Sequence, residues 1–187
     1  MSEGDLEELV NIKKLLKSCY SEGVFITHVS LINPKGKFQF NRNITEEFWS
    51  LYCSLIENDE NPDIGLAEKP QDMIPILVDV DLKIRAEEVK EYNITDSLYT
   101  ESELKSVVSI YQSILRSILD TCTDTDLTCV VLEKSMYQSN KNDIVIYKHG
   151  FHLHFPYIFL KKEEQDTQVI PRVKEEMKKT NLFINIG

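Results

Sequence analysis

Two aspartates one residue apart, Asp79 and Asp81, lie in a run from Pro75 to Ile84 that is otherwise largely apolar and β-branched. Such a run is typical of a β-strand, and because alternate side chains of a strand share a face, both carboxylates are predicted to project together. The run is apolar enough to predict a buried strand, in which two unpaired negative charges would be costly. A divalent cation such as Mg²⁺ resolves that conflict, since it prefers carboxylate oxygens and leaves room for phosphates. The alternative without a metal is that the pair caps a helix or meets Lys83 and Arg85.

A second strand-like run, Lys148 to Leu160, contains three of the four histidines within a span of six residues. His152 and His154 are predicted to share one face of that strand, whereas His149 is expected to be exposed. Gly150 permits a bulge or a close approach of the backbone to a ligand. Imidazoles suit either metal ligation or hydrogen bonding to a phosphate. Because none of the four cysteines has CxxC spacing, a structural zinc site is disfavoured, and contact between histidine and a triphosphate fits better.

The order of these segments resembles the archaeo-eukaryotic primase superfamily, in which a DxD pair on a strand precedes a small-residue-x-His motif. The resemblance is closest to the N-terminal primase modules of primase–helicases from large DNA viruses of the poxvirus, iridovirus, asfarvirus and giant-virus types. Their Ile-Leu-x-Asp-x-Asp and Gly-Phe-His-x-x-x-Pro runs are matched here by Ile76 to Asp81 and by Gly150 to Pro156. Together with Ser30 to Phe38 and Ala67 to Pro70, the similarity spans roughly residues 24–160.

The resemblance implies a metal-dependent nucleotidyltransferase, a primase that synthesises primers for viral DNA replication with Mg²⁺ or Mn²⁺. Asp79 and Asp81 match the catalytic, metal-binding pair, and His152 matches the catalytic histidine that contacts the nucleotide. Lys148 and His154 are predicted as further nucleotide-binding groups. The implied partners are nucleoside triphosphates, a DNA template and a C-terminal helicase module of the full-length protein. The implied location is intracellular, in the host cytoplasm or a viral factory.

The superfamily also uses a third acidic residue in a hydrophobic–Asp context on a later strand, and nothing in this sequence matches it. Asp166 lies in a polar stretch, and the sequence ends in the apolar run Phe183 to Gly187. We therefore expect residues 1–187 to be the N-terminal part of a primase-like catalytic domain that stops before the third carboxylate. If the third acid lies within this sequence after all, Asp143 and Asp166 are the first residues to test.

Composition is consistent with a domain that works inside the cell. With 187 residues, 42% of them hydrophobic, the chain can bury a core. No apolar run approaches the roughly 20 residues that span a bilayer, so no membrane partner is expected. The net charge of −10 argues against strong DNA binding by this domain alone, although residues 134–187 carry +3 against −13 for residues 1–133. The lysines close to the histidine run, which could face phosphates, are Lys134, Lys141, Lys148, Lys161 and Lys162.

The hydrophobic periodicity predicts an α+β fold, with a mixed or antiparallel sheet flanked by helices. Thr100 and Glu103 form a capping box that predicts a helix through about Leu119. Thr45 is predicted to cap an earlier helix. Separate strands are expected at 127–132 and 144–147 before the histidine run, and a last strand at 182–186.

Two alternative functions stay open. A metal-dependent nuclease would use the same carboxylates and histidines, with water as the nucleophile. A non-catalytic docking module of a replicative helicase would instead leave Asp79 and Asp81 paired with basic groups.

Overall fold

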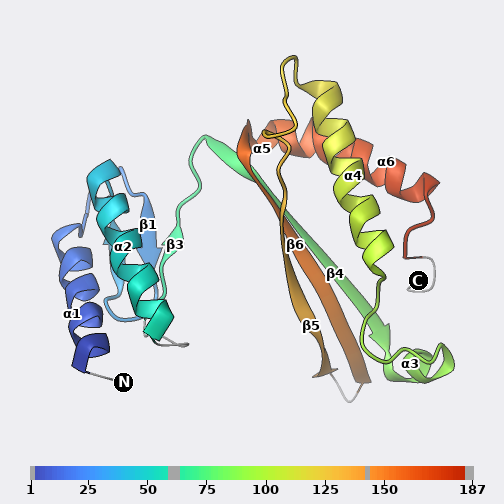
Figure 1. Ribbon diagram of the computed structural model, residues 1–187, viewed down its shortest axis with the longest axis horizontal. Helices are drawn as coiled ribbons and strands as arrows, with labels where there is room; N and C mark the ends of the chain where they lie inside the picture. The colour runs from blue at the N-terminus through green and yellow to red at the C-terminus, as the bar shows by residue number, and fades with distance from the viewer. Residues whose placement is uncertain (1–2, 59–63, 142–143, 184–187) are drawn as a thin grey trace. The chain divides into compact units, whose positions relative to one another are not determined.

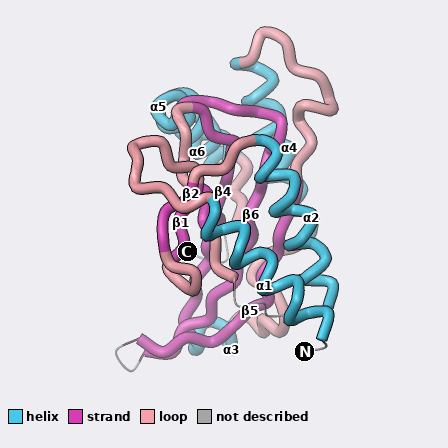
Figure 2. The backbone as a smooth tube through the Cα atoms, turned by 90° about the vertical axis from the view of Figure 1, so that its left-hand side faces the viewer, coloured by secondary structure: helices cyan, strands magenta, loops and turns pink. Residues whose placement is uncertain are grey.

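The computed structural model describes residues 3–58, 64–141 and 144–183. The chain divides into two compact units, residues 1–71 and 72–187. In the first unit two helices lie side by side (Figures 1 and 2), and three short antiparallel strands form a sheet in the order β2-β1-β3. The elements of this unit are α1 (Glu3–Ser18), β1 (His28–Ser30), β2 (Gly36–Phe38), α2 (Arg42–Asn58) and β3 (Ala67–Glu68).

The core of the first unit joins both helices to the sheet. Ile12 and Leu16 of α1 are at most 1% exposed, and they belong to one cluster with Phe38 of β2 and Leu55 of α2. Apolar side chains at helical spacing therefore bury one stripe of each helix, as expected for surface helices.

The first turn of α2 differs from the sequence prediction. The Asn41 side-chain oxygen accepts a hydrogen bond from the backbone N–H of Ile44 at 3.0 Å, so Asn41 is the N-cap. Thr45 instead lies within the helix, where its hydroxyl donates to the Asn41 carbonyl oxygen at 3.0 Å. The prediction of Thr45 as the cap is wrong, because asparagine caps a helix at least as well as threonine.

The second unit is a sheet of three long antiparallel strands in the order β4-β6-β5, with helices α4 and α6 on one side (Figure 1). This arrangement confirms the predicted α+β class and the antiparallel sheet flanked by helices. The elements are β4 (Met73–Arg85), α3 (Ala86–Glu91), α4 (Glu101–Ile118), β5 (Val130–Lys141), β6 (Ile144–Lys161), α5 (Lys162–Glu164), the π-helical turn η1 (Gln165–Val169) and α6 (Ile170–Lys179).

The boundaries of these elements agree with local sequence signals in part. The capping box at Thr100 and Glu103 is confirmed at the start of α4. The expected strand at 144–147 and the histidine run form one continuous strand, β6. The expected last strand at 182–186 lies mostly outside the described residues. Among the described helices, none is both long enough and apolar enough to cross a membrane.

The core of the second unit lies between the sheet and its helices. Alternate residues of β6, namely Phe151, Leu153 and Phe155, are at most 1% exposed and share a cluster with Val107 and Leu115 of α4. An antiparallel sheet packed in this way leaves its other face open to solvent. The two aspartates and the histidine that the sequence singled out for chemistry, Asp79, Asp81 and His152, lie on that open face.

Candidate active site

Strand register brings the two motifs together. In the antiparallel β4–β6 pair, Asp79 lies opposite His152, and Asp81 lies opposite Gly150. The Asp79 carboxylate oxygen Oδ1 is 3.2 Å from His152 Nε2. Asp79 and Asp81 share the open face, as strand alternation predicted.

The expectation that the aspartates lie on a buried strand is wrong. The side chains of Asp79 and Asp81 are each 66% exposed. The apolar residues between and beside them, including Val78 and Val80, pack against the helix-covered core instead. The strand is therefore dry on one face only, and desolvation does not force a cation onto the carboxylates. Lys83 Nζ lies 3.8 Å from Asp81 Oδ2, an exposed contact that contributes little.

The open face changes character along the strands. At one end it is apolar, next come the carboxylates with His152, and beyond them it is basic. Cross-strand neighbours on one face contact each other, so each row acts as a unit. In the order β4, β6, β5, the four rows are Leu77, His154, Val130; then Asp79, His152, Leu132; then Asp81, Gly150, Lys134; then Lys83, Lys148, Tyr137.

The residues of the carboxylate and basic rows, apart from Lys83, line a cavity of about 410 Å³, to which all three strands contribute. Lys134 and Lys148 both line it, and their ammonium groups lie 4.5 and 6.0 Å from the centroid of the Tyr137 ring. A cation held over an aromatic face is restrained without losing its charge. The cavity thus has an acidic wall and a basic wall, an arrangement that suits a metal ion and a polyphosphate side by side.

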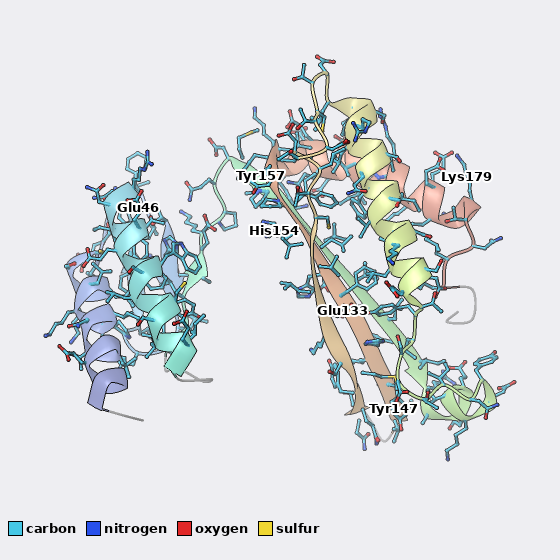
Figure 3. All side chains as sticks on the ribbon, in the orientation of Figure 1. Glu46, Glu133, Tyr147, His154, Tyr157 and Lys179 are labelled. Atoms are coloured by element: carbon cyan, nitrogen blue, oxygen red, sulfur yellow. The ribbon has the colours of Figure 1, made fainter. Side chains whose placement is uncertain are left out.

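The other predicted lysines and His154 are placed elsewhere. Lys161 lies beyond the apolar end of the open face, and Lys162 pairs with Asp166; the Lys141 side chain lies outside the described part. His154 lies opposite Leu77, on the side of the strands that α4 does not cover (Figure 3), but it does not line the cavity. A nucleotide contact of His154 stays a prediction.

His149 is buried, so the expectation that it is exposed is wrong. Its Nδ1 accepts a hydrogen bond from the Leu98 N–H at 3.0 Å, and its ring stacks on Tyr99 with centroids 4.5 Å apart. Burial lowers the pKa of His149, against the opposing effects of the Glu133 charge and the Lys134 backbone. His149 is therefore a neutral residue that ties the 97–99 loop to β6.

Two further groups next to the cavity were not found from the sequence. Glu133, labelled in Figure 3, lines the cavity, and the Tyr99 hydroxyl donates a hydrogen bond to its Oε2 at 3.0 Å. Burial raises the pKa of Tyr99, and the hydrogen bond to Glu133 raises it further. The Gly150 carbonyl oxygen lies 3.4 Å from the same hydroxyl. No spacing rule links residues so far apart in the chain, although a glutamate directly after the strand predicted at 127–132 and next to Lys134 was a signal.

Gly150 is required by the backbone of the neighbouring strand. A Cβ atom at this position would lie 2.1 Å from the Val80 carbonyl oxygen and 3.4 Å from Asp81 Cα. The predicted close approach is therefore to β4 itself. Only glycine lets the two strands meet at the position of the second aspartate.

Among the residues that the structure describes, no third carboxylate joins Asp79 and Asp81 closely enough to share a metal ion, and the Glu133 carboxylate, which also lines the cavity, accepts a hydrogen bond from Tyr99 instead. Asp166 lies on η1 and pairs with Lys162, away from the cavity, and Asp143 lies outside the described residues. In the described ranges, no three His, Cys, Asp or Glu side chains come close enough together to hold a metal ion. Asp79 and Asp81 fit a hard cation as a pair of oxygen donors, provided that phosphates and water complete its coordination.

The fold and the open-face aspartates beside a histidine define a primase-like α+β core. A family model described as the C962R protein N-terminal AEP domain matches residues 27–187. The chain belongs to this family, within the archaeo-eukaryotic primase superfamily.

Curated relatives come from large DNA viruses, as the resemblance predicted. The chain is 37% identical to "Putative helicase 121R" of Invertebrate iridescent virus 3 and 34% identical to "Putative helicase 184R" of Invertebrate iridescent virus 6, over 85% and 84% of its length. It is 28% identical over 71% of its length to "Putative helicase L207/L206" of Acanthamoeba polyphaga mimivirus. It covers only 17%, 17% and 13% of these three proteins.

Proposed function

We propose that this chain is the primase module of a viral primase–helicase, a metal-dependent nucleotidyltransferase that synthesises primers for DNA replication in an infected cell. The observation that carries the proposal is the cross-strand placement of Asp79 beside His152, with Asp81 one row away, in a cavity that also holds two lysines. Family membership supports the reaction class. The names of the relatives, together with their greater length, support a helicase module in the full-length protein.

Asp79 and Asp81 would hold Mg²⁺ or Mn²⁺, which when bound supplies positive charge to the reacting phosphate and lowers the pKa of an attacking hydroxyl. Both carboxylates are exposed, so they can accept a cation without rearrangement of the core. His152 lies where its ring can turn from Asp79 to donate to a phosphate oxygen. A fixed donor at this point orients the nucleotide for in-line attack.

Lys148 and Lys134 would hold the distal phosphates. Lys134 shares the row of Asp81, and Lys148 lies in the next row, on the side away from the apolar row, so a triphosphate that extends from the metal pair reaches both lysines. The Leu132 side chain, 59% exposed beside His152, offers an apolar surface to the sugar or base. The open face thus matches the polarity of a nucleotide from one end to the other.

The test of this function is strand synthesis by the full-length protein on a single-stranded DNA template with labelled nucleotides and Mn²⁺. New labelled strands that require both nucleotides and metal are expected. Residues 1–187 alone are expected to fold but to synthesise poorly, since they lack a matching third carboxylate. Shortening of the template without nucleotides would establish the nuclease instead, and the absence of either activity would favour the docking module.

Replacing His152 by alanine is expected to weaken nucleoside triphosphate binding by about 1.5–3 kcal/mol, the range for a hydrogen bond to a charged group. Calorimetric titration measures the affinity, and thermal unfolding provides the control. The melting temperature should be unchanged, because the His152 side chain is 63% exposed. A variant that unfolds early but binds nucleotide normally per folded molecule would assign His152 a structural role.

A further inference from the structure

A second cavity, of about 320 Å³, lies wholly within the first unit. Its walls come from α2, from β1 and β3, and from residues 64–66, which precede β3 (Figure 1). The volume is at the lower end of the range of about 300–1,000 Å³ for sites that bind small molecules. This cavity is distinct from the site on the β4–β6–β5 sheet, since every residue that lines it belongs to residues 28–68.

One wall of the cavity is aromatic. Phe48 and Tyr52 stack with ring centroids 5.5 Å apart, and Trp49 meets both rings edge-on at 5.7 and 5.8 Å. Phe48 is buried in the core, but Trp49 is 54% exposed. The indole therefore presents a flat apolar surface beside a cavity, where a planar ring can stack on it.

The strands β1 and β3 contribute two polar groups to the lining. His28 lies opposite Glu68 in the β1–β3 register, so both side chains share one face. His28 Nδ1 lies 2.9 Å from the Thr27 hydroxyl oxygen, whereas its Nε2 makes no hydrogen bond to any residue that the structure describes. Burial lowers the pKa of His28, against the charge of Glu68, so the ring is neutral at neutral pH.

The charge of the cavity excludes one class of ligand and favours another. Among the residues that the structure describes, no lysine or arginine lines it, so a phosphate would meet the Glu68 carboxylate and a neutral imidazole there. A planar ring with N–H donors on its edge fits better, because a carboxylate accepts hydrogen bonds and repels carbonyl oxygens. Cytosine, adenine and guanine carry such an amino group, whereas thymine presents carbonyl oxygens on both sides of its single N–H.

We propose that this cavity binds one base of a single-stranded nucleic acid, stacked on Trp49 with its amino edge toward Glu68. The inference rests on the proposed function, in which the protein acts on a single-stranded template. Stacking of a base on an aromatic side chain is tolerant of sequence. The Glu68 carboxylate adds a preference for amino-bearing bases.

Trp49 is the only tryptophan of the chain, so its fluorescence reports on this cavity alone. Titration with oligo(dC) is expected to quench the emission at a several-fold lower concentration than oligo(dT) of equal length. Glu68→Gln should remove this preference, because an amide can face either base edge. Glu57→Gln, which alters an exposed glutamate at the end of α2 outside the cavity, should keep it.

Several outcomes would overturn the proposal. Equal quenching by an abasic oligonucleotide would show a response to the backbone, and equal affinities for oligo(dC) and oligo(dT) would remove the role of Glu68. Quenching by choline but by neither oligonucleotide would assign the aromatic wall to an organic cation. In an Asp79→Asn, Asp81→Asn variant the quenching should persist. Intact quenching of Trp49 in residues 1–187, together with no strand synthesis by the full-length protein, would therefore refute the proposed function alone, and synthesis by the full-length protein without quenching in residues 1–187 would refute this inference alone.

Discussion

An Asp79→Asn, Asp81→Asn variant is expected to lose Mn²⁺ binding at the β4–β6 site and, in the full-length protein, to lose at least about a hundredfold in the rate of nucleotide transfer. Both charges are removed while size and hydrogen-bonding capacity are nearly kept. Folding should be preserved, since both side chains are two-thirds exposed and the substitution relieves repulsion between like charges. The electron paramagnetic resonance signal of free Mn²⁺ measures the binding, and primer extension measures the rate.

The matched control is Asp72→Asn, an exposed aspartate just before β4 that does not line the cavity. This variant should bind Mn²⁺ and transfer nucleotides as the unmodified protein does. If the double variant retained Mn²⁺ affinity, the metal would be bound elsewhere. If it lost transfer only because it no longer folded, circular dichroism would show the loss of β-structure.

Gly150→Ala is expected to destabilise the second unit by about 1–3 kcal/mol or more, the range for an atom forced into a packed site. The added methyl carbon would lie 2.1 Å from the Val80 carbonyl oxygen, and that atom belongs to the backbone, so it cannot turn away as a side chain could. The strands must separate at the row that holds Asp81. Mn²⁺ affinity should therefore fall together with the free energy of unfolding, which urea titration measures.

Gly23→Ala provides the comparison for this substitution. A Cβ atom at Gly23 would meet only the Ser21 hydroxyl oxygen at 3.3 Å, which a small rotation relieves. Its unfolding and its Mn²⁺ affinity should remain close to those of the unmodified protein. A Gly150→Ala variant with unchanged stability would mean that β4 and β6 tolerate a wider separation. The need for space beside a bound ligand, and not strand packing, would then explain the glycine.

Several features of the site could be predicted from the sequence because they depend on neighbours within a few residues. Strand alternation places Asp79 and Asp81 on one face whatever the strand packs against. The capping box of Thr100 and Glu103 closes within one helical turn. The order of the two motifs was enough to predict the family that the comparison confirms.

The tertiary structure decided which face of each strand is covered and which residues meet across the sheet. The aspartates looked buried in sequence because their neighbours are apolar, yet helices cover only one face, and the carboxylates lie on the other. His149 looked exposed but is buried, since the 97–99 loop folds over its ring. Asp79 meets His152 only through the register between strands that are distant in the chain. The hydrogen bond from Tyr99 to Glu133 likewise joins residues that are distant in the chain. Register is set by the packing of whole faces and by the close approach at Gly150, and neither is encoded in any short run of residues.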